Sequence, residues 1–421
     1  MGLLLDTEEL RRRVVDGWIG LYNPYPAEAV DLFHGNPLLP PPACVAEALR
    51  DLADSVATDA DPAHAVLLHP YRAPEIIAPE LEEAAVDDLA RDGVPVRPGR
   101  REVVCGVGVT QLMAALLQAF GDSGGAVLFP TPTYTFPLLA AAQIGGRAIF
   151  LTPSIGELGY EVDVDRIAAA LEAHRDIAAL FLVNPGNPTG EVLSPRKLAQ
   201  IAEVVARHPH VVVIVDEIYR HMILNGDAFQ SFAAMMFDRT ITLRGLSKCY
   251  GLARLRVGYA AAARDLLESI AIRTFIWFNT AAPSEVDQLL GAAALRCTPP
   301  SYFAWVVRTY RDLLEVVTAR LAQINERTDG MVEYVRPAAG SFVLLRMPKV
   351  RGRMTRDGQV LLRDGDLSRS LLRRGLAVVP GSVFGIPEYD MVVRITFTSP
   401  LNDLLAGLDI LESLLVETRT R

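Results

Sequence analysis

The stretch "IAALFLVNPGNPTGEVLSPRKLAQIAEVVARHPHVVVIVDEIY" runs from Ile177 to Tyr219 and decides the fold class. Runs of apolar residues at its two ends predict buried strands, and the segment between them has the apolar periodicity of a helix. Ser194 is a good N-cap for that helix, and Pro195 suits its first position. A strand, a covering helix and a second strand are typical of a parallel sheet that is covered on both faces.

The same alternation continues on either side. Further strands are expected at "EVVCGV", "AVLF", "RAIFLTP", "TITLRGLS" and "VGYAAA", and helices at "VTQLMAALLQAF", "YTFPLLAAAQIGG" and "DVDRIAAALEAH". After about residue 290 a long helical pattern precedes short strands and a last helix. We therefore predict an α/β fold: a mostly parallel, mixed sheet covered by helices on both faces, plus a smaller α+β C-terminal domain.

The predicted division has three parts. Residues 1–60 form an N-terminal arm and part of the small domain, residues 61–295 the large α/β domain, and residues 296–421 the small domain. The polar, Arg-rich segment 349–365 is expected to be an exposed loop or hairpin.

Charge and cysteine spacing exclude some classes of function. The 421-residue chain is 50% hydrophobic and carries a formal net charge of −9, which argues against nucleic acid and anionic membranes as partners. Its start lacks a secretory pattern and no stretch approaches ~18 apolar residues, so we expect a cytoplasmic protein. The widely spaced Cys44, Cys105, Cys249 and Cys297 are expected to be reduced thiols, and no metal site is expected.

Five unusual features follow strands, where open parallel sheets bind their ligands. Val109 and Thr110 in "GVGVTQL" begin a helix whose free N–H groups favour an anion such as phosphate, although a simple tight turn is the alternative. "NPGNPTG" contains two Asn-Pro pairs. One asparagine could cap this turn while the other points its amide into a cleft, unless the turn is only rigid.

Charged side chains complete the set. Asp216 ends an apolar strand, where it could bind a cationic ligand nitrogen, cap a helix or pair with an arginine. Lys248 is one of only three lysines; near cations or apolar walls it could form a Schiff base, whereas the alternative is a surface lysine. Arg256 could hold a phosphate, and Arg394 in "MVVRITFTS" a substrate or structural carboxylate.

One chemistry uses all five features, namely pyridoxal phosphate acting on an amino acid. With these motifs the chain resembles the fold-type I pyridoxal-phosphate enzymes, and specifically the class I/II aminotransferase family, over roughly residues 30 to 415. The motifs that carry the resemblance are "NPGNPTG", "DEIY", "SK" with an arginine eight residues on, and "VRITF".

The resemblance implies catalytic roles for Lys248, Asp216 and Tyr219. Lys248 would form the Schiff base with the cofactor and move the substrate's Cα proton. Asp216 would keep the pyridine nitrogen protonated. Tyr219 and Asn187 match the residues that hydrogen-bond the cofactor's phenolic oxygen, and Tyr134 falls where the family stacks an aromatic ring on the pyridine.

The resemblance also implies how the phosphate is held. Val109 and Thr110 match the phosphate-binding helix start, and Arg256 matches the phosphate arginine. Tyr71 resembles the tyrosine that reaches the phosphate of the neighbouring subunit, which implies a homodimer with shared active sites.

For the substrates, an amino acid and a 2-oxo acid, the resemblance implies that Arg394 binds the α-carboxylate. Gly35 would belong to the segment that closes over the substrate, and Asn187 would also contact the substrate. Side-chain specificity is not implied. Candidates for the pocket wall are His34, Arg72, His221, Trp277 and Phe278.

The chain departs from the family pattern at several places: the stretch "RTFIWFNTAAPSEVDQ" is unusually aromatic and segment 349–365 looks inserted. Gly245 stands where a serine or threonine is common, and the usual glycine and Leu-Arg pair do not follow Tyr71. We therefore weigh transamination against another fate of the same carbanion in specialised metabolism: elimination or replacement, C–C bond formation, cyclisation or oxidation. A regulator of this fold would need a DNA-binding module for which the roughly 30 residues before "LFHGNP" are too few.

Overall fold

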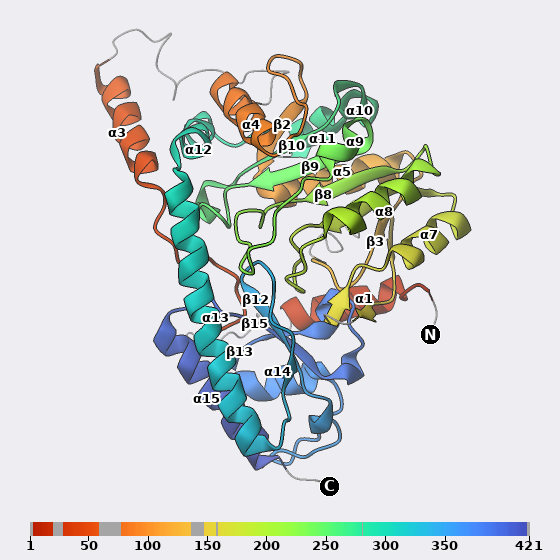
Figure 1. The fold of residues 1–421 in the computed structure, drawn as a ribbon, viewed down its shortest axis with the longest axis vertical. Helices are drawn as coiled ribbons and strands as arrows, with labels where there is room; N and C mark the ends of the chain where they lie inside the picture. Colours follow the sequence, from red (N-terminus) through yellow and green to blue (C-terminus); the bar gives the residue numbers. More distant parts are fainter. Residues whose placement is uncertain are drawn as a thin grey trace.

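A computed structural model describes residues 3–19, 28–58, 77–135, 147–156, 159–279 and 281–418 (Figure 1). Tyr71, Arg72 and most of the helix expected at "YTFPLLAAAQIGG" lie outside these ranges, as do the side chains of Trp277 and Phe278.

A seven-stranded mixed sheet forms the centre of the larger part, as predicted. Its strand order is β2-β10-β9-β8-β7-β3-β4. The strands from β9 to β4 run parallel to their neighbours, whereas β10 is antiparallel to both β2 and β9. The bounds are β2 (Val103–Val107), β3 (Ala126–Phe129), β4 (Arg147–Phe150), β7 (Ile177–Val183), β8 (Val212–Asp216), β9 (Thr240–Gly245) and β10 (Val257–Ala261).

Alternation along the central strands divides the core into two layers. Leu180 and Val213 pack in the cluster under α7 and α8, whereas Phe181 and Ile214 pack in the cluster on the opposite side, with α5. Both faces are therefore covered, as predicted (Figure 1). The helices of this part are α4 (Pro79–Arg91), α5 (Gly108–Asp122), α7 (Val164–Ala173), α8 (Pro195–Ala206), α9 (Ala233–Met236), α10 (Arg264–Ser269), α11 (Ile272–Asn279) and α12 (Glu285–Cys297).

The predicted cap of α8 is present. The Ser194 side chain accepts a hydrogen bond from the backbone N–H of Lys197 at 3.2 Å, and Pro195 is the first residue of the helix. The strand–helix–strand unit read from Ile177 to Tyr219 is thus confirmed, with β7 and β8 paired directly in parallel.

A four-stranded antiparallel sheet of order β11-β12-β15-β14 forms the centre of the second part. The long helix α13 links the two parts and packs against α15 (Figure 1). Strand β1 near the N-terminus pairs in parallel with β13 of the smaller part, whereas Leu4 forms a bridge with Leu151 beside β4 of the larger part. Bounds are β1 (Val30–Asp31), β11 (Glu333–Tyr334), β12 (Phe342–Arg346), β13 (Leu376–Ala377), β14 (Val379–Pro380), β15 (Val392–Thr396), α13 (Pro300–Thr328), α14 (Asp364–Arg373) and α15 (Leu401–Glu417).

Smaller elements lie around this framework. The helices α1 (Thr7–Val14) and α3 (Ala43–Thr58) flank the N-terminal segment, and β5 (Ser154–Gly156) and β6 (Gly159–Glu161) form a hairpin. Within 349–365 an antiparallel bridge joins Met354 to Val360, which agrees with the expected hairpin. The predicted domain boundaries stay a prediction.

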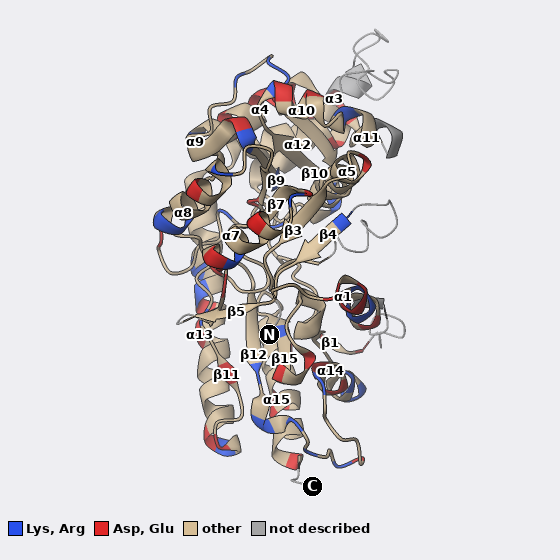
Figure 2. Cartoon of the chain, turned by 90° about the vertical axis from the view of Figure 1, so that its right-hand side faces the viewer, with Lys and Arg blue, Asp and Glu red and all other residues tan. Residues whose placement is uncertain are grey.

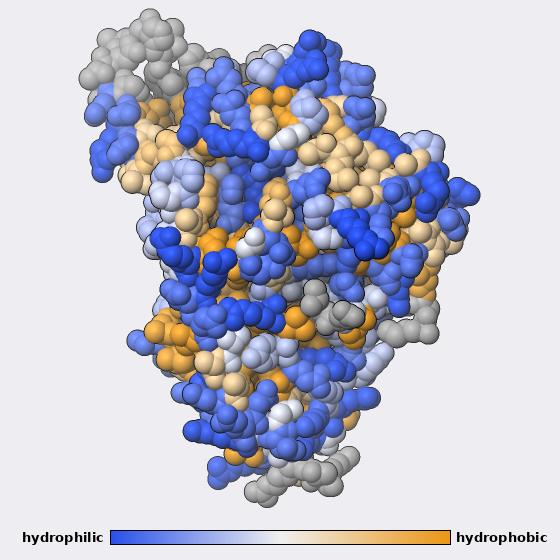
Figure 3. Space-filling view, in the orientation of Figure 1, coloured by the Kyte–Doolittle hydropathy of each residue, from blue (hydrophilic) through white to orange (hydrophobic). Residues whose placement is uncertain are grey.

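The surface carries charges of both signs. Lys and Arg alternate with Asp and Glu along α1 and α13 (Figure 2), and hydrophilic residues cover most of the face drawn in Figure 3. None of the helices in the described ranges combines the length and the apolar character that crossing a bilayer requires.

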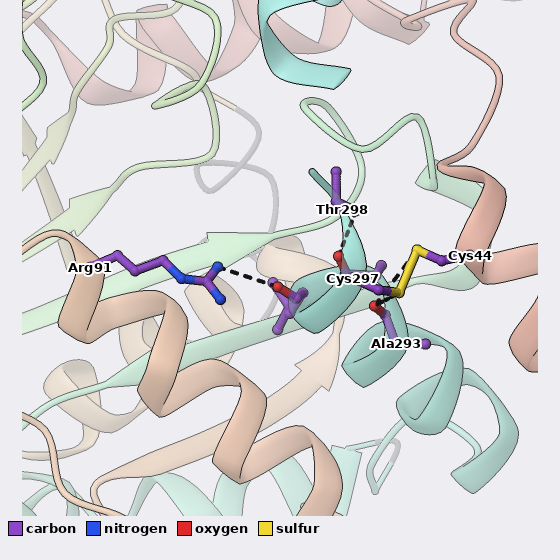
Figure 4. Close-up of a disulfide and its surroundings, with 7 residues drawn as sticks. Cys44, Arg91, Ala293, Cys297 and Thr298 are labelled. Carbon is purple, nitrogen blue, oxygen red and sulfur yellow. Dashed lines mark hydrogen bonds between the residues drawn. A yellow bond between two sulfur atoms is a disulfide. The ribbon is translucent and has the colours of Figure 1, made fainter. Parts of the chain in front are cut away.

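The cysteine prediction is wrong for one pair. Cys44 at the start of α3 and Cys297 at the end of α12 form a disulfide, with a Cα–Cα distance of 6.2 Å (Figure 4). Cys105 and Cys249 are buried free thiols, as expected. The two cysteines are 253 residues apart in the sequence, so their spacing could not indicate that they pair. The packing of α3 on α12 brings their sulfur atoms within bonding range.

We expect Cys44→Ser to lower the free energy of unfolding by roughly 2–4 kcal/mol, because it removes a cross-link that restricts the unfolded chain. Urea denaturation measures this value. Reductant should reproduce the loss in the wild type and leave the variant unchanged. If the wild type and the variant are equally stable without reductant, the assignment of a Cys44–Cys297 disulfide is contradicted.

Candidate active site

A cavity of about 950 Å³ opens where the central strands end, beneath the N-terminal segment. All ten predicted site residues within the described ranges line it. They are Gly35, Val109, Thr110, Tyr134, Asn187, Asp216, Tyr219, Lys248, Arg256 and Arg394. Tyr71 lies outside the described residues, so the structure does not place it.

The start of α5 and Arg256 form an anion-binding corner. Gly108 begins the helix with a φ of +71°, and a Cβ atom there would collide with the guanidinium of Arg256. Glycine therefore allows the arginine to lie over the free N–H groups at the helix start. Nη1 of Arg256 donates to the Ala253 carbonyl at 3.0 Å and, at 3.5 Å, to the Ser247 hydroxyl, which also lines the cavity. This corner suits a phosphate group.

Asp216 lies at the carboxyl end of β8 with its carboxyl group buried. Its Oδ1 accepts a hydrogen bond from the backbone N–H of Ile218 at 3.1 Å. Burial, with a smaller effect of the neighbouring Glu217, raises the pKa of Asp216 to about 7, although its backbone hydrogen bond and Lys248 oppose the shift. A cationic ligand atom beside this carboxyl group would favour its ionised form.

The alternative partner considered for Asp216, an arginine, pairs with the next residue instead. Arg244 donates to Oε2 of Glu217 at 2.9 and 2.8 Å, and the Ser231 hydroxyl donates to Oε1 at 2.6 Å. Arg244 also contacts Asp88 at 3.0 Å, and all of these side chains are buried. This network neutralises Glu217 and leaves Asp216 directed at the cavity.

Lys248 is half-buried in the cavity wall and is not the surface lysine of the alternative interpretation. Its Nζ donates to the carbonyl oxygen of Gly35 at 2.6 Å. Burial together with the nearby Arg394 and Arg256 lowers the pKa of Lys248 to about 8. A larger share of this amine is therefore neutral at pH 7 than of an ordinary lysine, and the neutral amine is the form that attacks an aldehyde.

Arg394 is held from several sides. Its Nη2 donates to the Phe33 carbonyl at 2.7 Å and its Nη1 to Oδ1 of Asn187 at 3.2 Å. The guanidinium lies 3.9 Å from the ring centre of Phe342 and 4.9 Å from that of Phe384. This setting fixes the orientation of a cation that can bind a carboxylate in two-point fashion.

The two asparagines of "NPGNPTG" divide their roles as predicted. Oδ1 of Asn184 accepts from the backbone N–H of Leu193 at 2.9 Å and so holds the turn. Asn187 instead lines the cavity. Tyr134 and Tyr219 line it as well, and burial, opposed in part by Arg394, raises the pKa of Tyr134 to about 12.

The missing hydroxyl at Gly245 has a structural reason. A Cβ atom at this position would lie 2.9 Å from Cγ2 of Val109, so the larger residue on α5 occupies the space that a serine would need. The hydroxyl groups of Thr110 and Ser247 line the same cavity and remain for hydrogen bonding.

Sequence reasoning missed most of the apolar wall. Phe33, Met113, Val183, Ile218 and Phe342 line the cavity. Phe342 in particular comes from β12, and a Cβ on Gly35 would collide with its ring. The sequence signal for this contact was Gly35, a glycine between two polar residues. Of the proposed wall candidates within the described side chains, His34 lines the cavity, whereas His221 stacks on Phe303 with ring centres 3.9 Å apart.

Comparison with known proteins agrees with this site. Residues 27–408 match the sequence model of aminotransferase class I and II, and the chain belongs to this family. It is 29% identical over 349 residues to the aspartate aminotransferase of Pyrococcus abyssi, covering 82% of this chain and 84% of that protein.

Two solved structures are similar as well. The aspartate aminotransferase from Rhizobium meliloti has a TM-score of 0.82 at 23% identity, covering 100% of this chain and 98% of that one, which shows the shared fold. The aromatic aminotransferase from Pyrococcus horikoshii has a TM-score of 0.78 at 26% identity, covering 96% and 98%.

The protein is therefore a pyridoxal-phosphate-dependent aminotransferase that uses an amino acid and a 2-oxo acid. The names of these relatives give no support to elimination, cyclisation or oxidation. The cavity fits the cofactor, because a phosphate corner, an acid whose pKa is raised by burial, and an amine with a lowered pKa all line it.

We expect Asp216→Asn to lower kcat of the holoenzyme roughly 100- to 1000-fold, because a neutral amide cannot stabilise a protonated ring nitrogen. The cofactor-free variant should be at least as stable as the wild type at pH 8. The pKa of Asp216 is higher in the folded state than in the unfolded state, so at pH 8 its negative charge disfavours folding. An asparagine removes this charge, and its side-chain oxygen can still accept the hydrogen bond from Ile218.

Steady-state kinetics and thermal denaturation measure the two effects. Asp238→Asn, on an exposed residue, is the matched control. A variant with kcat within threefold of the wild type would remove Asp216 from the chemistry.

Proposed function

We propose that this aminotransferase accepts an acidic amino acid, with aspartate as the first candidate, and acts through Lys248. The observation that carries the proposal is the meeting of Lys248, Asp216, Arg256 and Arg394 in one cavity. Aspartate is suggested by the relative from Pyrococcus abyssi, whose name describes an aspartate aminotransferase. Among the described residues that line the cavity, Lys248, Arg256 and Arg394 can carry positive charge, and the one carboxyl group is that of Asp216. This excess of positive charge favours anionic ligands.

Each group then has a distinct task. The α5 N-terminus with Arg256 binds the cofactor's phosphate, and Asn187 with Tyr219 hydrogen-bonds its phenolic oxygen. Tyr134 lies against the ring. Bound pyridoxal phosphate supplies an electron sink for the bond broken at the substrate's Cα.

The remaining groups act on the substrate and the proton. Arg394 binds the α-carboxylate and so orients the amino acid. Asp216 holds a proton on the ring nitrogen through its negative charge. Lys248 removes the proton from Cα and delivers it, which suits an amine whose pKa lies near the operating pH.

Aspartate should shift the absorption band of the yellow holoenzyme, because the first half-reaction leaves the cofactor in its amino form. A dicarboxylic 2-oxo acid should restore the band, because the second half-reaction consumes that amino form. Stopped-flow spectra measure both. Lys248→Ala should abolish the cycle. Lys349→Ala should not, because Lys349 donates a hydrogen bond to the Asp329 carbonyl and does not line the cavity. Release of ammonia, or a response to aromatic but not acidic amino acids, would contradict the proposal.

We also propose a homodimer in which Tyr71 of each subunit reaches the phosphate held by the other. The family resemblance supports this arrangement, and the N-terminal segment already forms part of the cavity wall. Light scattering should give twice the chain mass. Tyr71→Phe should weaken retention of the cofactor roughly tenfold by loss of one hydrogen bond. A monomeric, fully active holoenzyme would disprove this assembly.

A cytoplasmic location belongs to the proposal as well. A disulfide such as Cys44–Cys297 is unusual in that compartment, so cell fractionation with thiol trapping tests the location directly. Recovery of the protein from the secreted fraction would contradict it.

A further inference from the structure

One backbone segment joins the wall of the cavity to the disulfide. Phe33 and Gly35 near its start line the cavity, and the Gly35 carbonyl accepts the hydrogen bond from Lys248. Its last residue is Cys44, which the disulfide attaches to Cys297 at the end of α12. The contact to the proposed Cα base and the cross-link to α12 therefore belong to the same short stretch of chain.

The residues between these two points make the segment stiff. Four of the six residues from Pro37 to Pro42 are prolines. A proline fixes its own φ angle and has no backbone N–H group, so these four positions cannot hold the segment by donating hydrogen bonds. Because a proline-rich chain is semi-rigid, a shift at Cys44 is passed on toward Gly35 and is not absorbed on the way.

The middle of the segment lies against the turn that carries Lys248. The Leu39 carbonyl oxygen is 2.9 Å from the place where a Cβ atom on Gly251 would stand, and Gly251 has a φ of +67°. On α13, the Tyr302 hydroxyl donates to the Pro40 carbonyl at 2.9 Å. A segment released at its far end would therefore disturb the setting of the amine.

The disulfide at that far end is accessible from solvent. Cys297 is exposed and Cys44 is half-buried, and both line a surface cavity of about 440 Å³ beside Tyr302 and Trp305. The Ala293 carbonyl lies beside both sulfur atoms (Figure 4), so a thiol formed there has an acceptor. Exposed disulfides are the ones that thiols reduce most readily, so this cross-link can open and close in the folded chain.

We propose that Cys44–Cys297 is a redox switch: the disulfide holds the segment in the position that activity requires, and reduction by a dithiol lowers activity. This inference rests on the proposed function, because it concerns the control of that site. In a reducing compartment the enzyme rests in its less active form, and oxidation activates it. The alternative is a disulfide that only adds stability.

Reduction proceeds by thiol–disulfide exchange. A thiolate of the dithiol attacks Sγ of Cys297, the exposed member, and forms a mixed disulfide, while Cys44 leaves and takes up a proton. The second thiol of the reductant then closes the reductant's own disulfide and releases Cys297 as a thiol. In total, two electrons and two protons pass from the dithiol to the protein, and reoxidation reverses the exchange.

The test compares the oxidised holoenzyme with the holoenzyme reduced by dithiothreitol and then freed of it, well below the unfolding temperature. Titration in denaturant should find two thiols per chain before reduction and four after it. Reduction should lower kcat/KM for aspartate roughly tenfold, because a displaced wall no longer orients the substrate. Amide hydrogen exchange in the segment from Leu32 to Cys44 should become faster, and reoxidation should reverse both changes.

Cys297→Ser should behave like the reduced wild type and should not respond to dithiothreitol. Ser301→Ala, on an exposed residue of the same surface cavity, is the matched control and should keep the activity and the redox response of the wild type.

A reduced wild type whose kcat/KM stays within about twofold of the oxidised value would show that the disulfide only adds stability. That result overturns the inference and leaves the proposed function intact. If aspartate reacts in neither state, the proposed function is wrong, and hydrogen exchange decides the inference. Faster exchange on reduction would then support the switch, and unchanged exchange would overturn it.

Discussion

The site depends on one unfavourable interaction, the burial of the Asp216 carboxyl group at the end of β8. Burial raises its pKa to about 7, so the protein carries an acid that is best stabilised by a cation from outside the chain. The neighbouring Glu217 is also buried, and burial raises its pKa too, but Arg244 pairs with it and Ser231 donates a hydrogen bond to it. The fold therefore pairs one of two adjacent acids within the chain and leaves the other at the cavity, where we propose that it meets the protonated ring of the cofactor.

The N-terminal segment joins the two parts of the chain at this site. Its backbone carbonyls accept from Lys248, in the turn after β9 of the large sheet, and from Arg394, in β15 of the small one. Further along, the Tyr302 hydroxyl donates to the Pro40 carbonyl at 2.9 Å, and the Cys44–Cys297 disulfide fixes the start of α3. A segment tied to both parts can hold the cavity walls in register, which is what precise placement of a substrate requires.

Local patterns predicted most of the central sheet and the polar groups of the site. Ser194, the two asparagines and the acid after β8 were readable because each depends on residues close by in sequence. The antiparallel direction of β10, the disulfide and the position of Phe342 depend on contacts between distant segments, for which the sequence contains no periodic signal. His34 could be named as a candidate for the cavity wall, but its contact with Asp31 required the fold.

Reduction of the holoenzyme with borohydride, followed by proteolysis and mass spectrometry, tests the central claim most directly. The chain has only three lysines, and two of them lie in other settings: Lys197 is paired with Glu161 and Glu191, and Lys349 with the Asp329 carbonyl. The account predicts a reduced pyridoxyl group on the peptide with Lys248 alone. A label on either other lysine, or none on Lys248, would contradict it.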